Sequence, residues 1–431
     1  MKKSLNYTSE DDDEHQKNQK GKLSLMPIFL TVFIDMIGIG IIIPIFAPML
    51  LDINSNLVPA YYSLADRTLI LGILMGVYPM AQFFGAPILG AISDRVGRKK
   101  ILLLSLVGTV IGYALSAIGI MQGSITIIII GRIIDGFTGG NISIAMSAIA
   151  DVSDEKEKAK NFGIIGTAFG LGLILGPFIG GKLSDHSAVS WFNNSTPFWF
   201  AAILSIMNII FVIWFFKETL KIRINSSISF LTGIRNIKKV FYMPNLNILF
   251  LVIFLLSFGF TFYTQFFSVY LIDKFSFNAV QIGNFFAYVG LWIAITQATL
   301  IGPISKRFAS EKVLSFSMVL FGIILLFLLL PKEAYLLFFI VPFIAICQGI
   351  IRPNYTAMVS NLSDKKSQGE IMGINQSIQA LAMSIPPIIA GVISGFHVAA
   401  PIFVASACTF LAWIVFVKFF NKKNRDVFHE E

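Results

Sequence analysis

The feature that most constrains this chain is an apolar run of about 20 residues that recurs from one end of the sequence to the other. A helix of that length crosses the ~30 Å hydrocarbon core of a bilayer. Charged residues make up only 13% of the chain, about half of their share in a typical soluble protein. We therefore expect an all-α membrane protein with twelve transmembrane helices. The expected spans are 26–50, 69–92, 101–121, 125–150, 160–183, 196–217, 246–272, 279–303, 312–331, 334–359, 370–394 and 399–420.

Lys and Arg gather in alternate loops, as expected for cytoplasmic segments. The basic segments are 1–25, 93–100, 151–160, 217–239, 304–312, 360–369 and the tail from Lys418. The loops of the other side hold only Arg67, Lys182, Lys274 and Lys332. The pattern predicts a multi-pass protein of a bacterial inner membrane with both termini in the cytoplasm. The net charge of +9 then reflects topology, so we expect no nucleic-acid partner.

The longest polar segment divides the spans into two sets of six. We expect an N-terminal half over 26–217, a cytoplasmic linker over 218–245, a C-terminal half over 246–420 and a cytoplasmic tail over 421–431. Residues 1–25 lack the apolar core of a signal peptide. Their polar composition predicts a disordered cytoplasmic tail.

Two blocks of the first half recur in register in the second half. Gly90–Leu102 aligns with Gly302–Leu314, and Asp151–Ile164 aligns with Asn361–Ile374. The second alignment also places Pro177 on Pro387 and Gly181 on Gly391. We therefore expect two pseudo-symmetric six-helix halves, with a substrate site between them near the membrane midplane.

The junction of the second and third spans reads Gly90-Ala-Ile-Ser-Asp-Arg-Val-Gly-Arg-Lys-Lys100. Gly97 can take a positive φ in a tight turn, and Gly90 can let two helices approach closely. Asp94 can face a helix N-terminus and Arg98 can reach a carboxylate. The alternative is a generic basic loop on the cytoplasmic side.

This string resembles the loop signature of the major facilitator superfamily, and the resemblance covers almost the whole chain. It implies that Asp94 engages the start of the eleventh helix. It also implies that Arg98 meets an acid at the end of the fourth helix, where this chain has Asp151. The expected conformational gate consists of Gly90, Asp94, Arg95, Gly97, Arg98 and Asp151.

The fourth span contains Arg132, about two turns from its outer end. An arginine at such depth costs ~2.5–3.5 kcal/mol on insertion, so it should face a cavity or a partner. It matches a fourth-helix arginine of the superfamily, and the resemblance ties that arginine to proton transfer.

The fifth span holds glycines at regular spacing and a proline. Glycines every four residues form a smooth packing face, and Pro177 favours a kink. The spacing matches the signature of proton-linked exporters in the superfamily, so it favours export over import. The alternative is an ordinary small-residue packing face. The residues are Gly163, Gly172, Gly176, Pro177, Gly180 and Gly181.

Asp35 lies nine residues inside the first expected span (26 to 35), or about 14 Å deep at ~1.5 Å per residue. A charged carboxylate is costly near the midplane, which makes Asp35 a candidate proton carrier. A structural salt bridge to Arg132 is the alternative, and both roles can coexist. Asp135 lies one turn from Arg132 and is a competing partner for it.

Several polar side chains within the spans are candidates for the substrate cavity. Arg352 in the tenth span could bind an anionic group of the substrate or pair with a carboxylate such as Asp35. The other candidates are neutral, and a helix–helix hydrogen bond is the commoner role for such residues. The expected cavity residues are Asn141, Gln265, Gln297, Arg352, Asn354 and Gln376.

Within the superfamily the chain resembles tetracycline/proton antiporters and related drug exporters. The stretches that carry this resemblance are Asp35–Pro44, Gly90–Leu106 and Ser147–Gly181.

Three positions depart from the tetracycline exporters. Gly112 stands where they have an acid in the third span, and Ile293 stands where they have a histidine in the eighth. Gln297, one turn after Ile293, is retained, but the ninth span from Val313 to Leu330 contains no acid. We therefore expect a cargo other than tetracycline.

Together these features predict a proton-coupled secondary transporter that exports small amphipathic organic compounds by alternating access. A symporter that imports a small metabolite is the alternative. The sequence offers no nucleophile–base pair, metal-ligand cluster or phosphate loop, so we expect neither an enzyme nor a cofactor or metal. The expected partners are a small-molecule substrate, protons and the lipid bilayer, and a monomer suffices.

Overall fold

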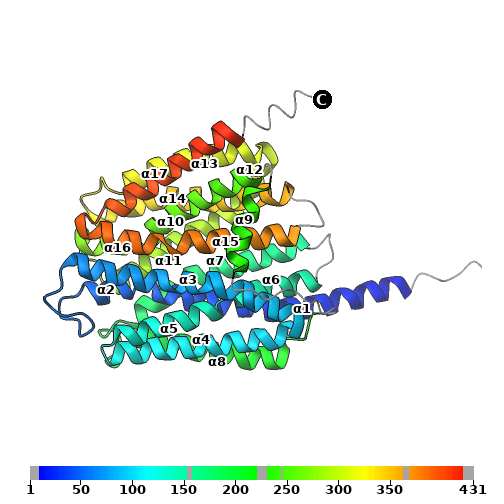
Figure 1. Ribbon diagram of the computed structural model, residues 1–431, viewed down its shortest axis with the longest axis horizontal. Coiled ribbons are helices and arrows are strands. Elements are labelled where there is room, and N and C mark those ends of the chain that lie inside the picture. Colours follow the sequence, from blue (N-terminus) through cyan, green and yellow to red (C-terminus); the bar gives the residue numbers. More distant parts are fainter. Residues whose placement is uncertain (1–8, 153–157, 221–230, 244–245, 363–367, 421–431) are drawn as a thin grey trace, which may run out of the picture.

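The computed structural model describes residues 9–152, 158–220, 231–243, 246–362 and 368–420. Within these ranges the chain is helical, and the long helices run side by side in one bundle (Figure 1). The helices before the linker are α1 (Ser9–Ile42), α2 (Phe46–Leu51), α3 (Leu64–Val96), α4 (Arg98–Met121), α5 (Ile125–Thr138), α6 (Asn141–Val152), α7 (Lys158–Leu183) and α8 (Thr196–Phe215). The later helices are α9 (Thr232–Phe241), α10 (Leu246–Phe275), α11 (Ala279–Thr299), α12 (Ile301–Arg307), α13 (Ser310–Phe327), α14 (Leu337–Asn361), α15 (Gln368–Ser384), α16 (Pro386–Phe396) and α17 (Ala400–Val415).

The described residues contain 11 helical segments that are long and apolar enough to cross a membrane. They match eleven of the expected spans, from Met26–Leu51 to Ala400–Phe420. The remaining expected span, 160–183, lies on α7, whose apolar part is Gly170–Leu183. The all-α membrane fold is therefore confirmed, and twelve spans in two halves fit the structure.

Three spans are interrupted where the sequence weakens helical hydrogen bonding. The first breaks between α1 and α2 at Pro44, which lacks a backbone N–H. The fourth breaks between α5 and α6 at Gly139 and Gly140, the residue type that loses most entropy in a helix. The eleventh breaks between α15 and α16 just before Pro386 and Pro387, which lack the backbone N–H groups that would continue the helical hydrogen bonds.

The second span of each half begins with the same capping arrangement. The Ser63 side chain accepts a hydrogen bond from the backbone N–H of Asp66, which bonds back to Ser63, at the start of α3. Asn278 and Gln281 form the same reciprocal pair at the start of α11. Such capping boxes satisfy N–H groups that a helix start leaves without partners. Their equivalent positions agree with the expected duplication of the halves.

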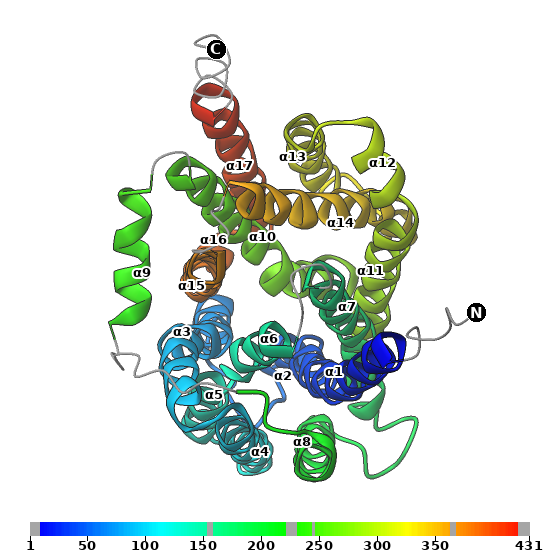
Figure 2. The same ribbon diagram turned by 90° about the vertical axis from the view of Figure 1, so that its right-hand side faces the viewer.

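The first and last residues that the structure describes, Ser9 and Phe420, lie at one end of the bundle, which we call the terminal end (Figures 1 and 2). The two halves pack against each other at the opposite end. There the Thr68 hydroxyl of α3 donates to the carbonyl of Gly391 in α16 at 2.8 Å. On the other side of the bundle, a Cβ at Gly181 of α7 would lie 2.8 Å from the carbonyl oxygen of Ala279 at the start of α11. At this end of the bundle, the backbones of the two halves are therefore in direct contact.

Two segments differ from the expected domain boundaries. Helix α1 starts at Ser9, so it includes part of the tail that we expected to be disordered. The expected linker contains a ten-residue helix, α9, that the sequence analysis did not anticipate. The tail over 421–431 lies outside the described residues.

Arg67 anchors the loop between α2 and α3 at the opposite end. The sequence analysis placed it in a loop, whereas the structure places it in the first turns of α3, where it is 3% exposed. Its guanidinium donates to the backbone carbonyls of Leu50, Asp52, Pro59 and Tyr62 at 2.8–3.2 Å. Four carbonyl partners satisfy a buried cation without an acid.

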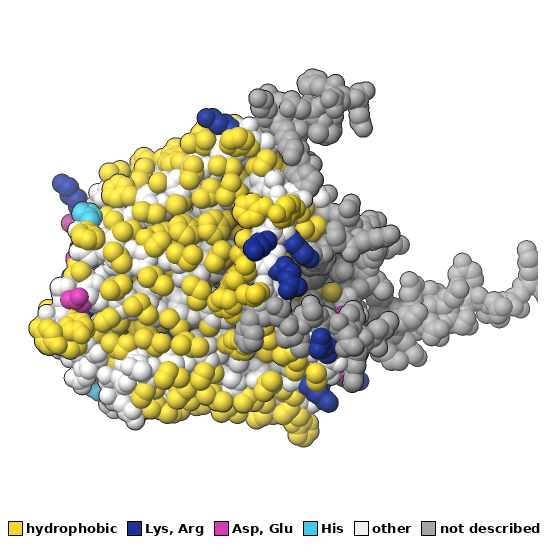
Figure 3. Space-filling view, viewed as in Figure 1, with side chains coloured by type: hydrophobic (Ala, Val, Ile, Leu, Met, Phe, Trp, Pro, Cys, Tyr) yellow, Lys and Arg dark blue, Asp and Glu magenta, His cyan; other side chains and the backbone are white. Residues whose placement is uncertain are grey.

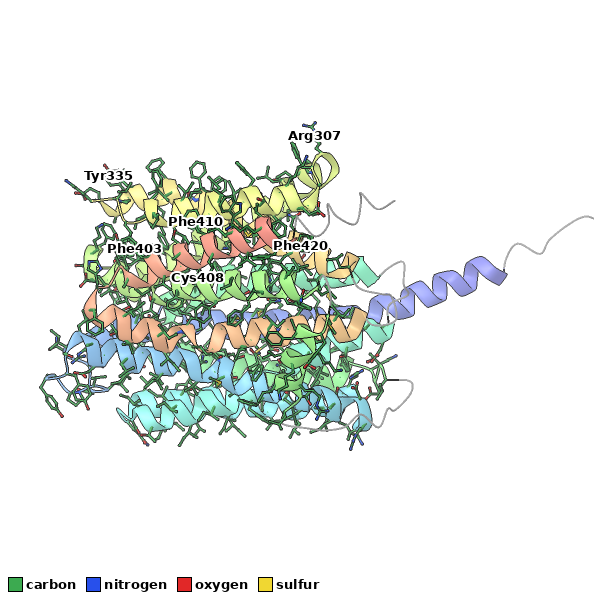
Figure 4. The ribbon with its side chains drawn as sticks, turned by 45° about the horizontal axis from the view of Figure 1, so that its top comes forward. Arg307, Tyr335, Phe403, Cys408, Phe410 and Phe420 are labelled. Atoms are coloured by element: carbon green, nitrogen blue, oxygen red, sulfur yellow. The ribbon has the colours of Figure 1, made fainter. Side chains whose placement is uncertain are left out.

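The outer surface of the bundle is apolar over most of its length, as a lipid-facing belt requires (Figure 3). Figure 4 marks the two ends of the C-terminal half with Arg307 at the terminal end and Tyr335 at the opposite end. Between α13 and α17, the Ser406 hydroxyl donates to the carbonyl of Gly322 at 2.7 Å, and Phe410 packs on the same glycine.

Candidate functional site

Polar side chains from five helices of the N-terminal half surround a small cavity inside the bundle. They are Asp35 of α1, Tyr78 of α3, Tyr113 of α4, Asp135 of α5 and Asn141 of α6. Ile39, Thr109 and Gly139 complete the lining. Asp35, Asp135 and Asn141, predicted as two proton-coupling residues and one cavity residue, therefore share one site.

Asp35 is buried, with 7% of its surface exposed. Its Oδ2 accepts a hydrogen bond from the Asn141 amide at 2.5 Å. Its Oδ1 has no hydrogen-bond partner among the described residues. A buried polar atom without a partner carries a desolvation cost, which a bound proton or water can relieve. The carboxylate thus has one oxygen held and one available.

Arg132 is equally buried and pairs with Asp135 rather than with Asp35. Its Nη1 lies 3.6 Å from Asp135 Oδ2. The guanidinium also lies over the Tyr78 ring, 4.5 Å from its centroid, and 5.8 Å from the Phe46 ring. Of the two pairings that the sequence left open, the structure contains the local one. The Asp35–Arg132 salt bridge is not formed.

Gly112 makes room for Asp135. A Cβ built at Gly112 would lie 2.5 Å from the Asp135 Cβ, so any side chain there would collide with it. In the same way, Gly38 of α1 receives the Tyr113 hydroxyl. The tetracycline exporters that this chain resembles carry a third-span acid at the position of Gly112. In this chain that position faces Asp135, an acid of the fourth span.

The gate residues form a second charged cluster at the terminal end. Arg98 Nη1 binds Asp94 Oδ1 at 2.5 Å and donates to Ser93 Oγ at 2.7 Å. Arg98 Nε binds Asp151 Oδ2 of α6 at 3.0 Å. Arg98 thereby reaches an acid at the end of the fourth span, the contact that the resemblance implied. Gly97, at the turn, has the positive φ of 120° that its position required.

Not every gate residue lies as expected. A Cβ at Gly90 would meet only Ser143 Oγ at 3.8 Å, so Gly90 does not permit a close helix approach. That approach occurs one to two turns earlier, where Gly85 of α3 meets the backbone of Phe137 in α5. Arg95 is half-buried in the last turn of α3.

Glu218 completes this cluster, and the sequence analysis missed it. It follows α8, and its carboxylate accepts hydrogen bonds from the backbone N–H groups of Arg98 and Lys99 at 2.9 and 3.2 Å. A carboxylate at a helix N-terminus satisfies free donors and complements the helix dipole. Glu218 lies 120 residues from Arg98 in sequence, so only the fold reveals the contact.

The glycines of α7 serve two contacts. Gly172, Gly176 and Gly180 pack on α1, and a Cβ at Gly176 would lie 2.7 Å from Gly40 Cα. Gly181 and the carbonyl of Pro177 instead contact α11 of the other half. The side chains around Gly163 lie outside the described residues. Helix α7 therefore packs on α1, the helix that carries Asp35, and also forms part of the contact between the two halves.

The structure does not gather the remaining cavity candidates. Gln297, Arg352 and Gln376 are exposed, and Gln265 is partly buried. Asn354 is buried and donates to the carbonyl of Ile350 in its own helix at 2.8 Å. Only Asn141 lies in the polar cavity.

Comparison with known proteins places this geometry in a family. The family model described as "Major Facilitator Superfamily" matches residues 28–300 and 289–429. The chain is 30% identical over 406 residues to "Tetracycline resistance protein, class C" of Escherichia coli, covering 92% of this chain and 94% of that protein. It is 27% identical over 401 residues to "Quinolone resistance protein NorA" of Staphylococcus aureus, covering 90% and 94%.

Solved structures show the same fold. The human organic anion transporter MFSD10 (TETRAN) superposes with a TM-score of 0.71 at 21% identity, covering 92% of this chain and 99% of that one. A D-xylose-proton symporter superposes with a TM-score of 0.74 at 14% identity, covering 92% and 98%. The helical bundle, the charged cluster at its loop and these matches agree: the chain is a multi-pass membrane transporter, not an enzyme, and belongs to the Major Facilitator Superfamily.

Proposed function

We propose that this transporter is a proton-driven exporter of small amphipathic organic compounds. The observation that carries the proposal is the state of Asp35, which is buried at mid-depth with one oxygen held by Asn141 and the other without a described partner. Its neighbours on α1 pack directly on the glycine face of α7, and the far side of α7 touches the other half. A proton on Asp35 therefore acts where helix movement can reach the interface.

Protonation of Asp35 first changes its hydrogen bond with Asn141. A charged carboxylate accepts a stronger hydrogen bond than a neutral acid, so protonation of Asp35 weakens its bond to the Asn141 amide. Asn141 is the first residue of α6, directly after the break at Gly139 and Gly140. Asp151, near the other end of α6, binds Arg98 in the gate cluster. Helix α6 thus links the proton site to the gate.

Orientation follows from the distribution of charge. The loops at the terminal end carry most of the Lys and Arg residues, so both termini are cytoplasmic in a bacterial inner membrane. The contacts of Thr68 with Gly391 and of Gly181 with Ala279 then close the outer side. Both halves belong to one chain, so a monomer provides the complete site.

Export is favoured by two observations. The α7 glycines fit the signature of proton-linked exporters, and two relatives over about nine-tenths of the chain are named for resistance to tetracycline and quinolone. The third-, eighth- and ninth-span departures described above point to an amphipathic cargo other than tetracycline. A planar or weakly charged drug-like compound fits this expectation.

Inverted membrane vesicles test direction and coupling together. With an acid lumen, the wild type should accumulate a fluorescent member of a drug panel and release luminal protons in proportion. Asp35→Asn should lower both fluxes by more than about tenfold, equivalent to about 1.4 kcal/mol of transition-state stabilisation. Unchanged coupling in Asp35→Asn would refute the role of Asp35. Accumulation only in right-side-out vesicles would instead indicate import.

A further inference from the structure

Helix α9 of the linker lies across the bundle instead of along it. In Figure 1 its axis is perpendicular to the spans, and in Figure 2 it lies outside the ring of helices, beside α3 and α15. Gly233 of α9 packs on the Phe83 ring of α3, at 2.8 Å from a built Cβ. Asn236 donates to Ser377 Oγ of α15 at 3.2 Å. The helix therefore touches both halves from the perimeter.

Both contacts place α9 at one depth. Phe83 lies 19 residues after Leu64 (83 − 64), the outer start of α3. Ser377 lies 19 residues before Phe396 (396 − 377), the outer end of α16. At ~1.5 Å per residue each distance is about 28 Å, close to the ~30 Å thickness of the hydrocarbon core. Both contacts thus place α9 on the inner-leaflet side of the bundle, toward the terminal end.

The outward surface of α9 has two kinds of side chain. Ile234 and Phe241, seven residues apart on one face, are 39% and 75% exposed, and Tyr242 is 86% exposed. Arg235 and Lys238 are exposed on the adjoining face, and Lys239 follows. In Figure 3, basic side chains gather beside hydrophobic ones in the area that α9 occupies. A helix with an apolar stripe flanked by Lys and Arg suits an anionic bilayer surface.

The surrounding sequence carries no opposing charge. From Thr219 to Ile272 the chain contains no Asp or Glu. Each basic residue next to a bilayer contributes about 1 kcal/mol to the attraction of anionic lipids, which corresponds to about fivefold in affinity. We propose that α9 binds anionic phospholipid headgroups of the inner leaflet through Arg235 and Lys238, with Ile234 and Phe241 inserted between the acyl chains.

This site goes beyond proton-coupled export, because the lipid is neither cargo nor coupling ion. It gives both halves a common attachment to the membrane through Gly233 and Asn236. Its test does not require transport.

Quenching by brominated lipid provides that test. In the full-length chain with Cys347 and Cys408 replaced by serine, Phe241→Cys is labelled with an environment-sensitive fluorophore. Phosphatidylglycerol with brominated acyl chains, titrated into mixed micelles, should quench the label at much lower mole fraction than brominated phosphatidylcholine. Arg235→Gln with Lys238→Gln should raise the half-quenching fraction of phosphatidylglycerol on the order of 25-fold.

A matched control removes the same charge elsewhere at the terminal end. Arg307→Gln with Lys312→Gln, both exposed positions, should leave the quenching curve unchanged. Equal quenching by the two lipids, no quenching, or an equal loss in the control would each overturn the proposal. If Phe241→Cys does not fold, a label at Tyr242→Cys reports the same surface.

Discussion

The two halves of the molecule repeat one helix order but differ in what their interiors hold. In the C-terminal half, the buried polar side chains that the structure describes are neutral, and aromatic rings fill much of the space between them. In the N-terminal half, the described interior holds charge around the cavity lined by Asp35, in the Arg98 cluster and at the loop that Arg67 anchors. Its buried charged residues are Asp35, Arg67, Arg98, Arg132 and Asp135.

The first helix of each half shows the same contrast in packing. Helix α1 meets α7 through glycines, such as Gly40 on Gly176. Helix α10 packs on α11 through rings, with Phe267 and Phe285 centroids 5.5 Å apart, and Tyr263 extends this ring cluster along α10, 5.0 Å from Phe267. Rings interdigitate, whereas glycines let two helix backbones approach closely with no side chain between them. The repeat thus duplicates a scaffold, while buried charge and glycine packing characterise the described N-terminal half and aromatic packing characterises the C-terminal half.

The largest test of this comparison uses one arginine from the fourth span and one from the tenth. Arg132→Gln leaves Asp135 buried without its cation, which should cost about 3–5 kcal/mol of stability. Arg352 is exposed, so Arg352→Gln should cost less than about 1 kcal/mol. The midpoint of thermal unfolding of the purified protein measures both. Equal losses would mean that the exposed Arg352 supports the fold of the C-terminal half as strongly as the buried Arg132 supports the N-terminal half.

A smaller loss of stability should come from a change in the contact between α1 and the glycines of α7. In Gly176→Ala the new Cβ would lie 2.7 Å from Gly40 Cα, and such overpacking costs about 1–3 kcal/mol. Gly170 lies on the same helix, and a Cβ there meets nothing within 4 Å among the described residues. Gly170→Ala should therefore be neutral or stabilise by up to about 1 kcal/mol through helix propensity.

Transport rates sharpen the same experiment. Gly176→Ala should slow export more than it weakens substrate binding, because it impedes movement of α1 on α7. If Gly170→Ala slows export equally, helix propensity and not the contact explains the loss.

The smallest effect should appear among the rings of the C-terminal half. The Tyr263 hydroxyl is buried without a hydrogen-bond partner among the described residues, so Tyr263→Phe should change stability by less than about 0.5 kcal/mol. The Tyr270 hydroxyl donates to the carbonyl of Leu328 at 3.3 Å and accepts from Lys274 at 2.8 Å. Tyr270→Phe should therefore cost about 1 kcal/mol. Unfolding midpoints of the two variants compare them directly, and a large loss in Tyr263→Phe would reveal an unrecognised polar partner.

Hydrophobicity made the spans predictable, because membrane insertion leaves few alternatives to long helices. The expected bounds agree closely with the structure, as in 125–150 against Ile125–Val152. Positions set by one local rule were also predictable, such as the positive φ of Gly97. Helix α9 was missed because it is short and polar enough to read as a loop.

Contacts between distant segments were harder to predict. Asp35 and Asn141 are 106 residues apart, and their hydrogen bond depends on how α1 and α6 pack. From the sequence, Arg132 could pair with either Asp35 or Asp135, and only the fold shows that it pairs with Asp135. Glu218 carried no signal in a single sequence, since an acid after a span is common.

The one-sided placement of buried charge has an electrical consequence. A membrane potential acts on charge and contributes ~2.3 kcal/mol per elementary charge per 100 mV across the full bilayer. Because the described buried charges belong to the N-terminal half, voltage does work on that half while the other contributes no buried charge of its own. A proton that enters from outside and stops at Asp35 crosses roughly half of the field, so voltage should add about 1 kcal/mol per 100 mV to loading. Export should therefore respond to voltage even when no pH gradient is present.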